Sequence, residues 1–513
     1  MTPDDPAAPA APPTGGHVDD TAAAGHDTAG TATGHGTAGT TTPAAHVHDV
    51  VGVGFGPANL GLAVALAEGA GPGERGVDTL FLESRPTFAW HPGLLLPDTP
   101  VRSSFLRDLV TPRTPRSRFT FINYLHEHGR LVEFINRRTV APDRGEVADY
   151  LAWVAGLVPA RVAYGSVVRG VEVLDGTPAR FRVTVDAGAG PGRHGEPRRG
   201  TPRPADPRSG DPRSGDTRAA DRRAADPRRG RTETGGRVHR YLARSVVLAC
   251  GSAPVLPAWA DDPALGGTMR VVHASDLVPR MAWLTRRGMV GPGFRALVVG
   301  GGQSAVETVR HLHDRGVHVT AVTAGYGYAR ADTGPFAHRV ADAAGADAVA
   351  AAPADVRADL LARARAGLTG GVDPALLTDL HDREYRQRWS GRRRLEVLRA
   401  SEVTRVGSTP AGLVEADVTD RMTGAVTTVT VDVVVCATGL RPRPVGDVLP
   451  AGVEWTVGRD HRVAADGVPV PGLFAQGAAE DPSGPGSTLL STVATRAGEV
   501  AGALRDDLRA AAG

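Results

Sequence analysis

The chain has no lysine: all 58 of its Lys and Arg residues are arginine, against 56 acidic residues and a net charge of +2. This balance argues against a partner that is nucleic acid or an anionic membrane. No run of about 18 apolar residues predicts a membrane span, and the first residues lack the basic start and apolar core of a signal peptide. The two cysteines, Cys250 and Cys436, form no Cys-x-x-Cys pair and predict small buried side chains in a reducing cytoplasm.

Two segments are poor in the residues that build a core. Residues 1–46 consist mainly of Ala, Gly, Thr, Pro and Asp, which predicts a disordered tail. Residues 187–237 are rich in Arg, Asp, Pro and Gly and predict a disordered insertion, whose interleaved Asp argues against a nucleic-acid-binding arm. Five histidines could bind metal adventitiously, but we expect them to belong to a solvated tail and predict no metal site: His17, His26, His35, His46 and His48.

What the chain does contain is a pair of glycine-rich turns. The first reads Gly54-x-Gly56-x-x-Asn59, and the second reads Gly300-x-Gly302. Each follows a short apolar run and opens a helix-like stretch, which is the strand–turn–helix setting of a dinucleotide site. The glycines let backbone approach a pyrophosphate, and the helix N-terminus supplies N–H donors. Two such turns in context predict two dinucleotides, most economically FAD and NADPH.

The residues after the next strand of each unit point to the two cofactors. Glu83 ends the apolar run 79–82, at the position where an acid binds the ribose hydroxyls of FAD. After the corresponding strand of the second unit, 317–322, no acid follows; Thr323 and then Arg330 occur instead. Because an arginine pairs with a 2′-phosphate that an acid would repel, we expect NADPH rather than NADH.

We therefore predict an α/β protein with two Rossmann-like dinucleotide-binding domains and a smaller, mostly helical substrate domain. Inside the helical part we expect six leucines to point inward, and elsewhere a strand over 427–435 and a closing helix over 487–508. The leucines are Leu360, Leu361, Leu368, Leu376, Leu377 and Leu380. The predicted domains are 47–255 with 433–513 for FAD, 256–330 with 394–432 for NADPH, and 331–393 for the helical part.

Several further motifs are specific in combination. They are Trp90-His91-Pro92-Gly93, Ser-Phe-Leu-Arg-Asp-Leu-Val-Thr at 104–111, Phe-Ile-Asn-Tyr-Leu-His-Glu at 121–127, and Leu-Leu-Ser at 489–491. With the two glycine turns, these motifs resemble the L-lysine/L-ornithine N-monooxygenase family. The resemblance covers 47–180, 240–335 and 432–505, which is most of the chain outside the low-complexity segments.

The resemblance implies a flavin-dependent N-hydroxylating monooxygenase of siderophore or other N–O-containing natural-product biosynthesis. In such enzymes NADPH reduces FAD, O2 adds to give a C4a-hydroperoxyflavin, and the neutral primary amine of a small amino acid attacks it. Family members are commonly homo-oligomers, with a tetramer expected here. The implied cofactor contacts are Gly54, Gly56, Pro57, Asn59, Glu83, Trp90, His91, Gly300, Gly302, Gln303, Ser304, Arg330, Thr438, Gly439, Gly477, Thr488 and Leu489.

The sequence departs from the family at its substrate contacts. A Gln and a Lys of the family are Arg102 and Arg107 here, and a family Asn is His338. Arg107 can still bind an α-carboxylate, so the resemblance implies L-lysine or L-ornithine as the substrate. A pocket richer in cations suits an acidic amino acid such as L-aspartate instead. These three side chains could equally bind phosphates or face solvent. A flavin reductase without oxygen chemistry is a further alternative, although it would need a redox cysteine pair or an electron-partner surface.

Overall fold

The computed structural model describes residues 46–69, 76–176, 178–187, 237–261, 269–332, 334–478, 486 and 489–511. Residues 1–45 of the predicted tail, almost all of the predicted insertion, and Thr488 lie outside these residues. None of the helices in the described ranges combines the length and apolarity that crossing a bilayer requires.

The first sheet has nine strands, and its middle is parallel. Its order is β17-β18-β19-β6-β1-β2-β3, and β4 and β5 extend from β6 as an antiparallel pair. The apolar run 50–53 is buried within the sheet, as expected for a parallel strand covered on both faces. The strands are β1 (Val47–Val53), β2 (Thr79–Glu83), β3 (Arg161–Tyr164), β4 (Ser166–Val173), β5 (Phe181–Ala187), β6 (Arg237–Leu248), β17 (Trp455–Val457), β18 (Arg462–Ala465) and β19 (Val468–Ala475).

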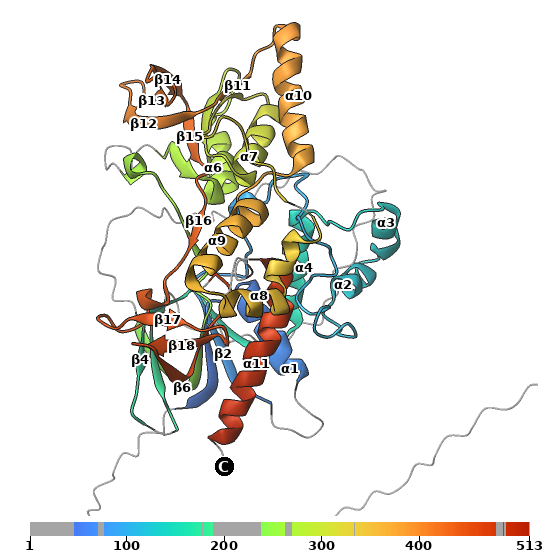
Figure 1. Cartoon of the computed structure of the whole chain (residues 1–513), viewed down its shortest axis with the longest axis vertical. Coiled ribbons are helices and arrows are strands. Elements are labelled where there is room, and N and C mark those ends of the chain that lie inside the picture. The colour runs from blue at the N-terminus through green and yellow to red at the C-terminus, as the bar shows by residue number, and fades with distance from the viewer. Residues whose placement is uncertain are drawn as a thin grey trace, which may run out of the picture. The chain divides into compact units, whose positions relative to one another are not determined.

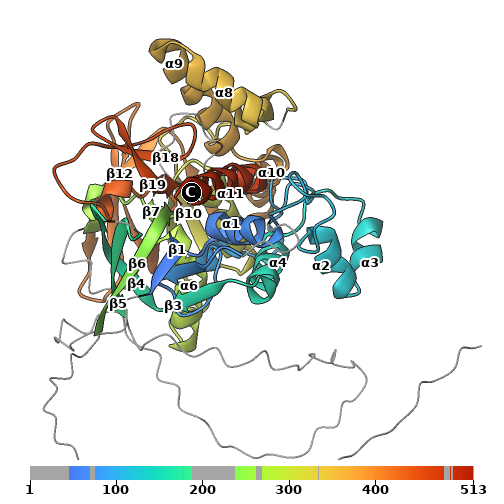
Figure 2. The ribbon, with the colours of Figure 1, turned by 90° about the horizontal axis from the view of Figure 1, so that it is seen from below.

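Helices α1 (Pro57–Glu68) and α11 (Val493–Ala510) lie side by side against this sheet (Figures 1 and 2). A Cβ at Gly61 would lie 2.8 Å from a side-chain carbon of Val493, so glycine permits this close helix packing. Three further helices pack around a buried aromatic cluster: α2 (Phe121–Glu127), α3 (Leu131–Asn136) and α4 (Arg144–Leu157).

The second sheet has five strands, all parallel, in the order β11-β10-β9-β15-β8. A three-stranded antiparallel sheet, β12-β13-β14, lies between β11 and β15 in the chain, and β7 pairs with β16 where the chain passes between the two large sheets. The strands are β7 (Ser252–Pro254), β8 (Val271–His273), β9 (Arg295–Val299), β10 (His318–Val322), β11 (Leu395–Leu398), β12 (Ser401–Ser408), β13 (Val414–Asp420), β14 (Val426–Val431), β15 (Val433–Cys436) and β16 (Leu440–Pro442). The helices of this unit are α6 (Leu277–Arg286) and α7 (Gln303–Asp314).

The stretch between β10 and β11 is helical. Its helices are the 3-10 helix η4 (Ala337–Ala341), α8 (Ala343–Ala351), α9 (Ala354–Ala364), the π-helical turn η5 (Arg365–Thr369) and α10 (Pro374–Ser390). Four of the six leucines predicted to point inward are buried and Leu377 packs against the core, but Leu360 is 40% exposed. Leu360 is one residue before Leu361, so a helix that buries one turns the other away.

Two boundaries predicted from sequence are wrong. The apolar run 427–435 is not one strand, because β14 ends at Val431 and β15 begins at Val433 in a different sheet. The strand is interrupted at Asp432, where the chain passes from one sheet to the other. The Asp432 carboxylate accepts a hydrogen bond from the backbone N–H of Arg295 at 2.9 Å. The closing helix begins at Val493 rather than near residue 487, after the short 3-10 helix η8 (Leu490–Thr492).

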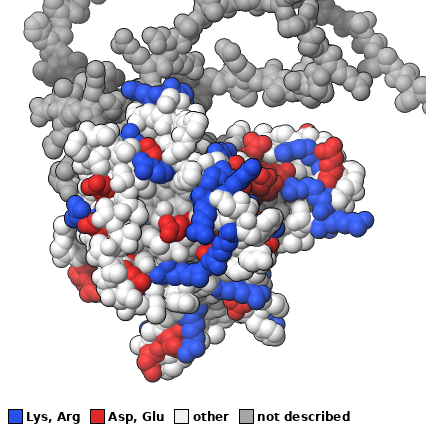
Figure 3. Space-filling view, turned by 90° about the horizontal axis from the view of Figure 1, so that it is seen from above, with Lys and Arg blue, Asp and Glu red and all other residues white. Residues whose placement is uncertain are grey.

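Charged side chains on the outer helices are largely paired within the helix. Along α10, Arg383, Arg386 and Arg388 each form an ion pair with an acidic residue one turn earlier. On the face seen in Figure 3, basic and acidic side chains occur side by side. Such exposed pairs contribute little to stability individually.

A buried ion pair joins the two dinucleotide units. Arg144, at the start of α4, donates through both terminal nitrogens to the Glu307 carboxylate of α7, at 3.0 Å each. Only 2% of the Glu307 side chain and 16% of the Arg144 side chain are exposed. Arg144 also donates to the carbonyl oxygen of Leu94 at 3.0 Å. The pair therefore fixes α7 of the second unit against the loop and helix of the first.

We expect Glu307→Ala to destabilise the protein by about 3 kcal/mol, because it leaves the Arg144 guanidinium buried without its carboxylate. The measurement is the urea midpoint followed by intrinsic fluorescence. Asp359→Ala is the matched control, because it removes a carboxylate paired only with exposed Arg363, and it should leave the midpoint unchanged. Equal midpoints for Glu307→Ala and the wild type would contradict the role given to this pair.

Candidate active site and cofactor cradles

The first glycine turn forms an open cradle at the start of α1. Gly54 has φ +84°, and a Cβ there would lie 2.5 Å from the carbonyl oxygen of Ala249, so only glycine fits. Gly56 precedes the helix in extended conformation, and a Cβ there would meet nothing within 4 Å. Pro57 is the first helical residue, and no side chain caps the helix. Uncapped N–H groups facing open space fit a pyrophosphate.

Three side chains hold this turn from within. Asn59 is fully buried; its amide donates to the carbonyl oxygen of Gly54 at 2.7 Å and accepts from the Gln476 amide at 2.8 Å. Glu83 lies at the end of β2, and its carboxylate accepts from the backbone N–H of Phe55 at 2.8 Å. Asn59 and Glu83 thus shape the turn, and their direct contact with FAD stays a prediction. The sequence analysis missed Gln476, which follows β19 far along the chain.

The C-terminal part of the chain returns to this cradle. Gly477 has φ +72°, and a Cβ there would lie 3.0 Å from the Cβ of Ala58 in the first turn of α1. Leu489 is half-buried just before η8. The predicted contact Thr488 lies outside the described residues.

Thr438 and Gly439 lie where the chain leaves the second sheet. The Thr438 hydroxyl donates to the carbonyl oxygen of Val255. Gly439 has φ +97°, and its carbonyl oxygen lies 3.0 Å from Nε2 of His273. Both residues close the passage between the two units, and their contact with a cofactor stays a prediction.

The Trp-His-Pro-Gly motif lies where the two dinucleotide-binding units come into close contact. Trp90 is half-buried, packs against the aromatic cluster of the first unit, and lines a cavity of about 640 Å³ together with Phe88. A Cβ at Gly93 would lie 1.7 Å from the carbonyl oxygen of Ser275, so glycine is required for this approach. The predicted contact of Trp90 with the flavin ring is not tested by this geometry.

His91 has a strained backbone and a neutral ring. Its φ of +43° places a non-glycine residue in the left-handed region. Desolvation, followed by the cations Arg144 and Arg85, lowers the pKa of His91 to about 4, although the residue as a whole is exposed. At neutral pH the ring is therefore uncharged and can accept a hydrogen bond as well as donate one.

The second glycine turn repeats the first. A Cβ at Gly300, whose φ is +147°, would lie 2.2 Å from the carbonyl oxygen of Ala437. At Gly302 the nearest atom would be the carbonyl oxygen of Gly370 at 3.7 Å, and no side chain caps α7. Ser304 is half-buried in the first turn of that helix. This cradle therefore also fits a pyrophosphate.

Gln303 and Arg330 differ in their freedom to contact a cofactor. The Gln303 amide donates to Glu307 at 2.8 Å and accepts from the backbone N–H of Asp373 at 2.8 Å, so the side chain is engaged within the protein. Arg330 is exposed after β10, and its side chain forms no ion pair with any residue the structure describes. The Arg330 side chain is therefore available for the predicted contact with a 2′-phosphate.

Arg102 connects the loop before the Ser-Phe-Leu-Arg motif to the helical segment. Its terminal nitrogens donate to the carbonyl oxygens of Leu368, at 2.8 Å, and Gly371, at 3.1 Å. The Arg102 guanidinium is therefore already hydrogen-bonded to backbone carbonyl oxygens. This engagement favours a positioning role over a direct substrate contact.

Arg107 lies beside an acid that the sequence analysis did not select. Its Nη1 is 3.5 Å from Oδ1 of Asp342, the residue that precedes α8, and both side chains are partly exposed. His338 is half-buried in η4, the 3-10 helix that ends one residue before Asp342. Arg107 is positioned by its neighbour Asp108, whose carboxylate accepts from the backbone N–H of Phe121 at 2.7 Å. Arg107 and the segment that contains His338 thus meet, with Asp342 as the contact.

The two cysteines are unsuited to thiol chemistry. Both are free, and Cys436 is fully buried. Burial raises the pKa of Cys436 to about 12 and, with a contribution from Asp447, that of Cys250 to about 11. Thiols with such pKa values carry almost no thiolate at neutral pH, which removes support from the disulfide-reductase alternative.

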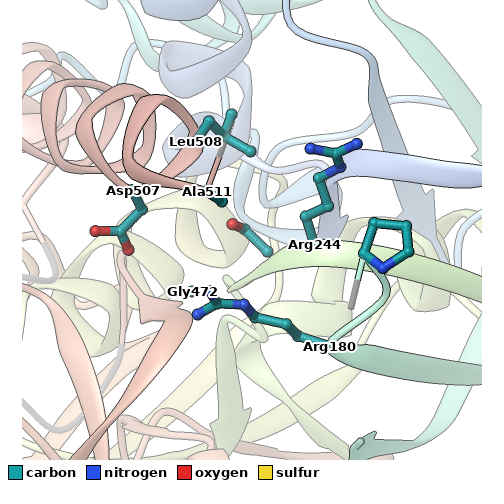
Figure 4. A pocket seen from close by; sticks show the side chains of 8 residues that line it. Arg180, Arg244, Gly472, Asp507, Leu508 and Ala511 are labelled. Carbon is teal, nitrogen blue, oxygen red and sulfur yellow. The ribbon is translucent and has the colours of Figure 1, made fainter. Parts of the chain in front are cut away.

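A separate cavity lies beyond the cradles, where the end of α11 meets β6 and β19. It measures about 440 Å³, and Figure 4 shows Arg180 and Arg244 on one side and Asp507 on the other. Neither glycine turn contributes to its lining.

Comparison with known proteins identifies the family. The family model described as L-lysine 6-monooxygenase/L-ornithine 5-monooxygenase matches residues 46–198 and 220–442. The chain belongs to this family. It is 35% identical to an L-ornithine N(5)-monooxygenase of Burkholderia cepacia over 85% of this chain and 90% of that protein.

Solved structures agree with this assignment. The ornithine N-hydroxylase of Kutzneria sp. 744, solved with reduced FAD, NADP+ and L-ornithine, has a TM-score of 0.73 and 31% identity, covering 90% of this chain and 99% of that one. The ornithine hydroxylase of Pseudomonas aeruginosa has a TM-score of 0.73 and 29% identity, covering 90% and 100%. These matches confirm the predicted α/β class with two dinucleotide-binding domains, the flavin-dependent N-hydroxylating monooxygenase class, and FAD and NADPH as the cofactors.

We expect Gly56→Ala to abolish FAD retention while the protein still folds. The added methyl group meets no protein atom within 4 Å, so it fills only the space of the cradle. Gly502→Ala in α11 is the matched control, because it is equally open and should keep its flavin. The measurement is the flavin-to-protein absorbance ratio after gel filtration. A stoichiometrically yellow Gly56→Ala protein would place the FAD pyrophosphate elsewhere.

Gly302→Ala tests the second cradle independently. It should keep FAD and weaken NADPH binding by tenfold or more, because the methyl group occupies the position of backbone approach. Anaerobic flavin reduction at varied NADPH concentration measures this affinity. Normal reduction at low NADPH would contradict the placement of the second dinucleotide.

Proposed function

We propose that this enzyme hydroxylates the side-chain amine of a diamino acid, with L-ornithine as the first choice and L-lysine as the second. Arg107 receives the α-carboxylate, and Asp342 receives the α-ammonium group. The observation that carries the proposal is the pair of opposite charges 3.5 Å apart beside the helical segment. The similarity to proteins named as ornithine hydroxylases supports it.

The Arg107–Asp342 pair has the properties of a binding site rather than of a structural bridge. A separation of 3.5 Å is longer than a charge-assisted hydrogen bond. The side chains are 37% and 50% exposed, so the pair is accessible to a ligand. An α-amino acid carries adjacent opposite charges, and it can satisfy both side chains at once. A substrate held in this way leaves its side-chain amine free to reach toward the flavin.

One segment of the chain relates this pair to the FAD cradle. Gly477 lies against Ala58 in the cradle helix, and a Cβ at Gly486 would lie 3.3 Å from the carbonyl oxygen of Ala341. Ala341 directly precedes Asp342. Gly477 thus lies against the cradle helix, and Gly486 lies against the residue that precedes Asp342.

The acidic-substrate alternative loses much of its support in this geometry. Arg102 already serves two backbone carbonyls, and the charge of Arg107 is opposed by Asp342. His338 alone still favours L-aspartate. In L-aspartate the reacting group is the α-amine itself, and a neighbouring Asp342 carboxylate would hold that amine in its unreactive, protonated form.

Reduced FAD supplies the activation of oxygen when it is bound. This chain's residues bind the two cofactors at uncapped helix ends, hold both units together through Glu307, and orient the substrate through Arg107. The reactive amine must be uncharged, and the substrate's own methylene chain separates it from the α-carbon and thus from the Asp342 carboxylate. The resulting N-hydroxylated amino acid suits siderophore or related natural-product biosynthesis.

The cellular setting and the assembly belong to this proposal as well. Free, buried cysteines among the described residues suit a reducing cytoplasm. A homo-oligomer, with a tetramer as the expected size, is measured by size-exclusion chromatography with light scattering.

Product coupling identifies the substrate. L-Ornithine, L-lysine, putrescine, cadaverine, L-aspartate and L-glutamate are each incubated with enzyme, NADPH and O2, and hydroxylamine formation and peroxide release are measured per NADPH consumed. We expect L-ornithine to give hydroxylated product for most of the NADPH and L-aspartate to give mainly peroxide. Coupled hydroxylation of L-aspartate alone would refute the diamino-acid assignment.

Substitutions at the charge pair test the orientation of the substrate. Arg107→Ala should raise the KM for L-ornithine at least tenfold, or about 1.4 kcal/mol, and leave anaerobic flavin reduction by NADPH near normal. Asp342→Asn should raise the same KM, because it removes the partner of the α-ammonium group. Cadaverine has no carboxylate, so Arg107→Ala should not weaken its turnover. A KM for L-ornithine unchanged by both substitutions would contradict the role of this pair.

A further inference from the structure

Two histidines and an aspartate meet at the N-terminal ends of β1 and β2, at the opposite end of these strands from the FAD cradle. His46 Nε2 lies 2.8 Å, and His48 Nδ1 2.9 Å, from the same Asp78 oxygen, Oδ2. The three potential ligand atoms all lie within 4.8 Å of one another. We infer that His46, His48 and Asp78 form a binding site for a divalent transition-metal ion, with Zn²⁺ as the best match.

The strand geometry brings these side chains together. His46 and His48 are two residues apart at the start of β1, so both project from the same face of the sheet. Asp78 directly precedes β2, which pairs in parallel with β1. The backbone of Asp78 is held on both sides: its carbonyl oxygen accepts from the N–H of Val50 at 3.1 Å, and its N–H donates to the Asp49 carboxylate at 3.0 Å. His48 thus lies within β1, and His46 and Asp78 directly precede β1 and β2, respectively.

Two of the three separations between ligand atoms require little change to admit an ion, and the two histidine nitrogens lie within 4.8 Å of each other. Zn–N and Zn–O bonds of about 2.0–2.1 Å in tetrahedral geometry separate ligand atoms by roughly 3.3 Å. The two hydrogen bonds from His46 and His48 to Asp78 need to lengthen by only about 0.5 Å to reach that separation. Two imidazoles and a carboxylate form a donor set that suits Zn²⁺, Cu²⁺ or Ni²⁺ better than Mg²⁺ or Ca²⁺.

The surroundings leave the ligand atoms available. Arg161 Nη1 lies 3.5 Å from the other Asp78 oxygen, Oδ1, so it can orient the carboxylate and leave Oδ2 for the metal. Asp49 is the next nearest acid, and its other oxygen lies 3.5 Å from Arg244 Nε. The His48 side chain is 4% exposed and that of His46 is 64% exposed. The site is therefore rigid on one side and open to ions and water on the other.

This site is separate from the proposed chemistry. It lies at the first residues of β1, whereas the FAD cradle follows the last residue of that strand. A bound ion would tie β1 to β2 at their N-terminal ends and stabilise the FAD-binding sheet by mass action. The prediction that His48 belongs to a solvated tail is wrong, because this residue is buried within β1. Its partner Asp78 lies 30 residues further along the chain, so the sequence pattern did not show the pairing.

The test uses full-length, tag-free, chelator-treated protein in which His17, His26 and His35 are replaced by Gln, so that histidines earlier in the chain do not contribute. Zn²⁺ binding is measured by equilibrium dialysis, and Co²⁺ binding by its visible absorption spectrum. We expect one Zn²⁺ per chain, a tetrahedral Co²⁺ spectrum, and a rise in melting temperature with Zn²⁺. His46→Ala and Asp78→Asn should each lower the affinity at least tenfold and abolish that spectrum.

His126→Ala is the matched control, because it removes another exposed histidine and should leave Zn²⁺ binding unchanged. His46→Ala removes an exposed side chain, so its flavin content should equal that of the parent protein and show that it is folded. Equal Zn²⁺ affinity in the parent and in His46→Ala would overturn the site. So would the absence of a tetrahedral Co²⁺ spectrum in the parent protein.

Discussion

The structure depends on one buried carboxylate, that of Glu307. It receives both terminal nitrogens of Arg144 from the FAD-binding unit and the Gln303 amide from the second glycine turn. Gln303 in turn accepts from the backbone of Asp373, at the start of α10 in the helical segment. A single ion therefore connects the flavin unit, the NADPH turn and the helical segment. Removing either partner of a buried ion pair leaves an uncompensated charge and is strongly destabilising. This connection therefore sets the relative position of the two cradles.

The proposed substrate end of the site rests on a second and weaker ion pair. Arg107 and Asp342 come from different segments and approach each other without closing into a short bridge. Replacing the family's lysine by arginine conserves the charge, as it must in a chain without lysine. In the proposed site Asp342 adds a negative charge beside Arg107, so the pair fits the two opposite charges of an α-amino acid. Arg102 instead donates hydrogen bonds to backbone carbonyl oxygens of the helical segment.

The sequence predicted what depends on local pattern. The glycine turns and Glu83 at the end of β2 follow from strand, turn and helix signals within a few residues. The sequence did not reveal Gln476 behind Asn59, Asp342 beside Arg107, or Asp78 beside His48, because each pair is brought together only by tertiary structure. The side chain of Gln303 was expected to face NADPH; its engagement with Glu307 is visible only once α7 is packed. The break at Asp432 also depends on which sheet each strand joins.

The central claim is that a diamino acid is held by its α-carbon charges, so that its far amine reaches the flavin. The most direct measurement is a crystal structure of the enzyme with FAD, NADP+ and L-ornithine. The account predicts the α-carboxylate within hydrogen-bonding distance of Arg107, the α-ammonium group at Asp342, and the side-chain amine directed at the flavin ring. A ligand bound in the opposite direction, with its α-amine at the flavin and its side-chain amine at Asp342, would contradict it.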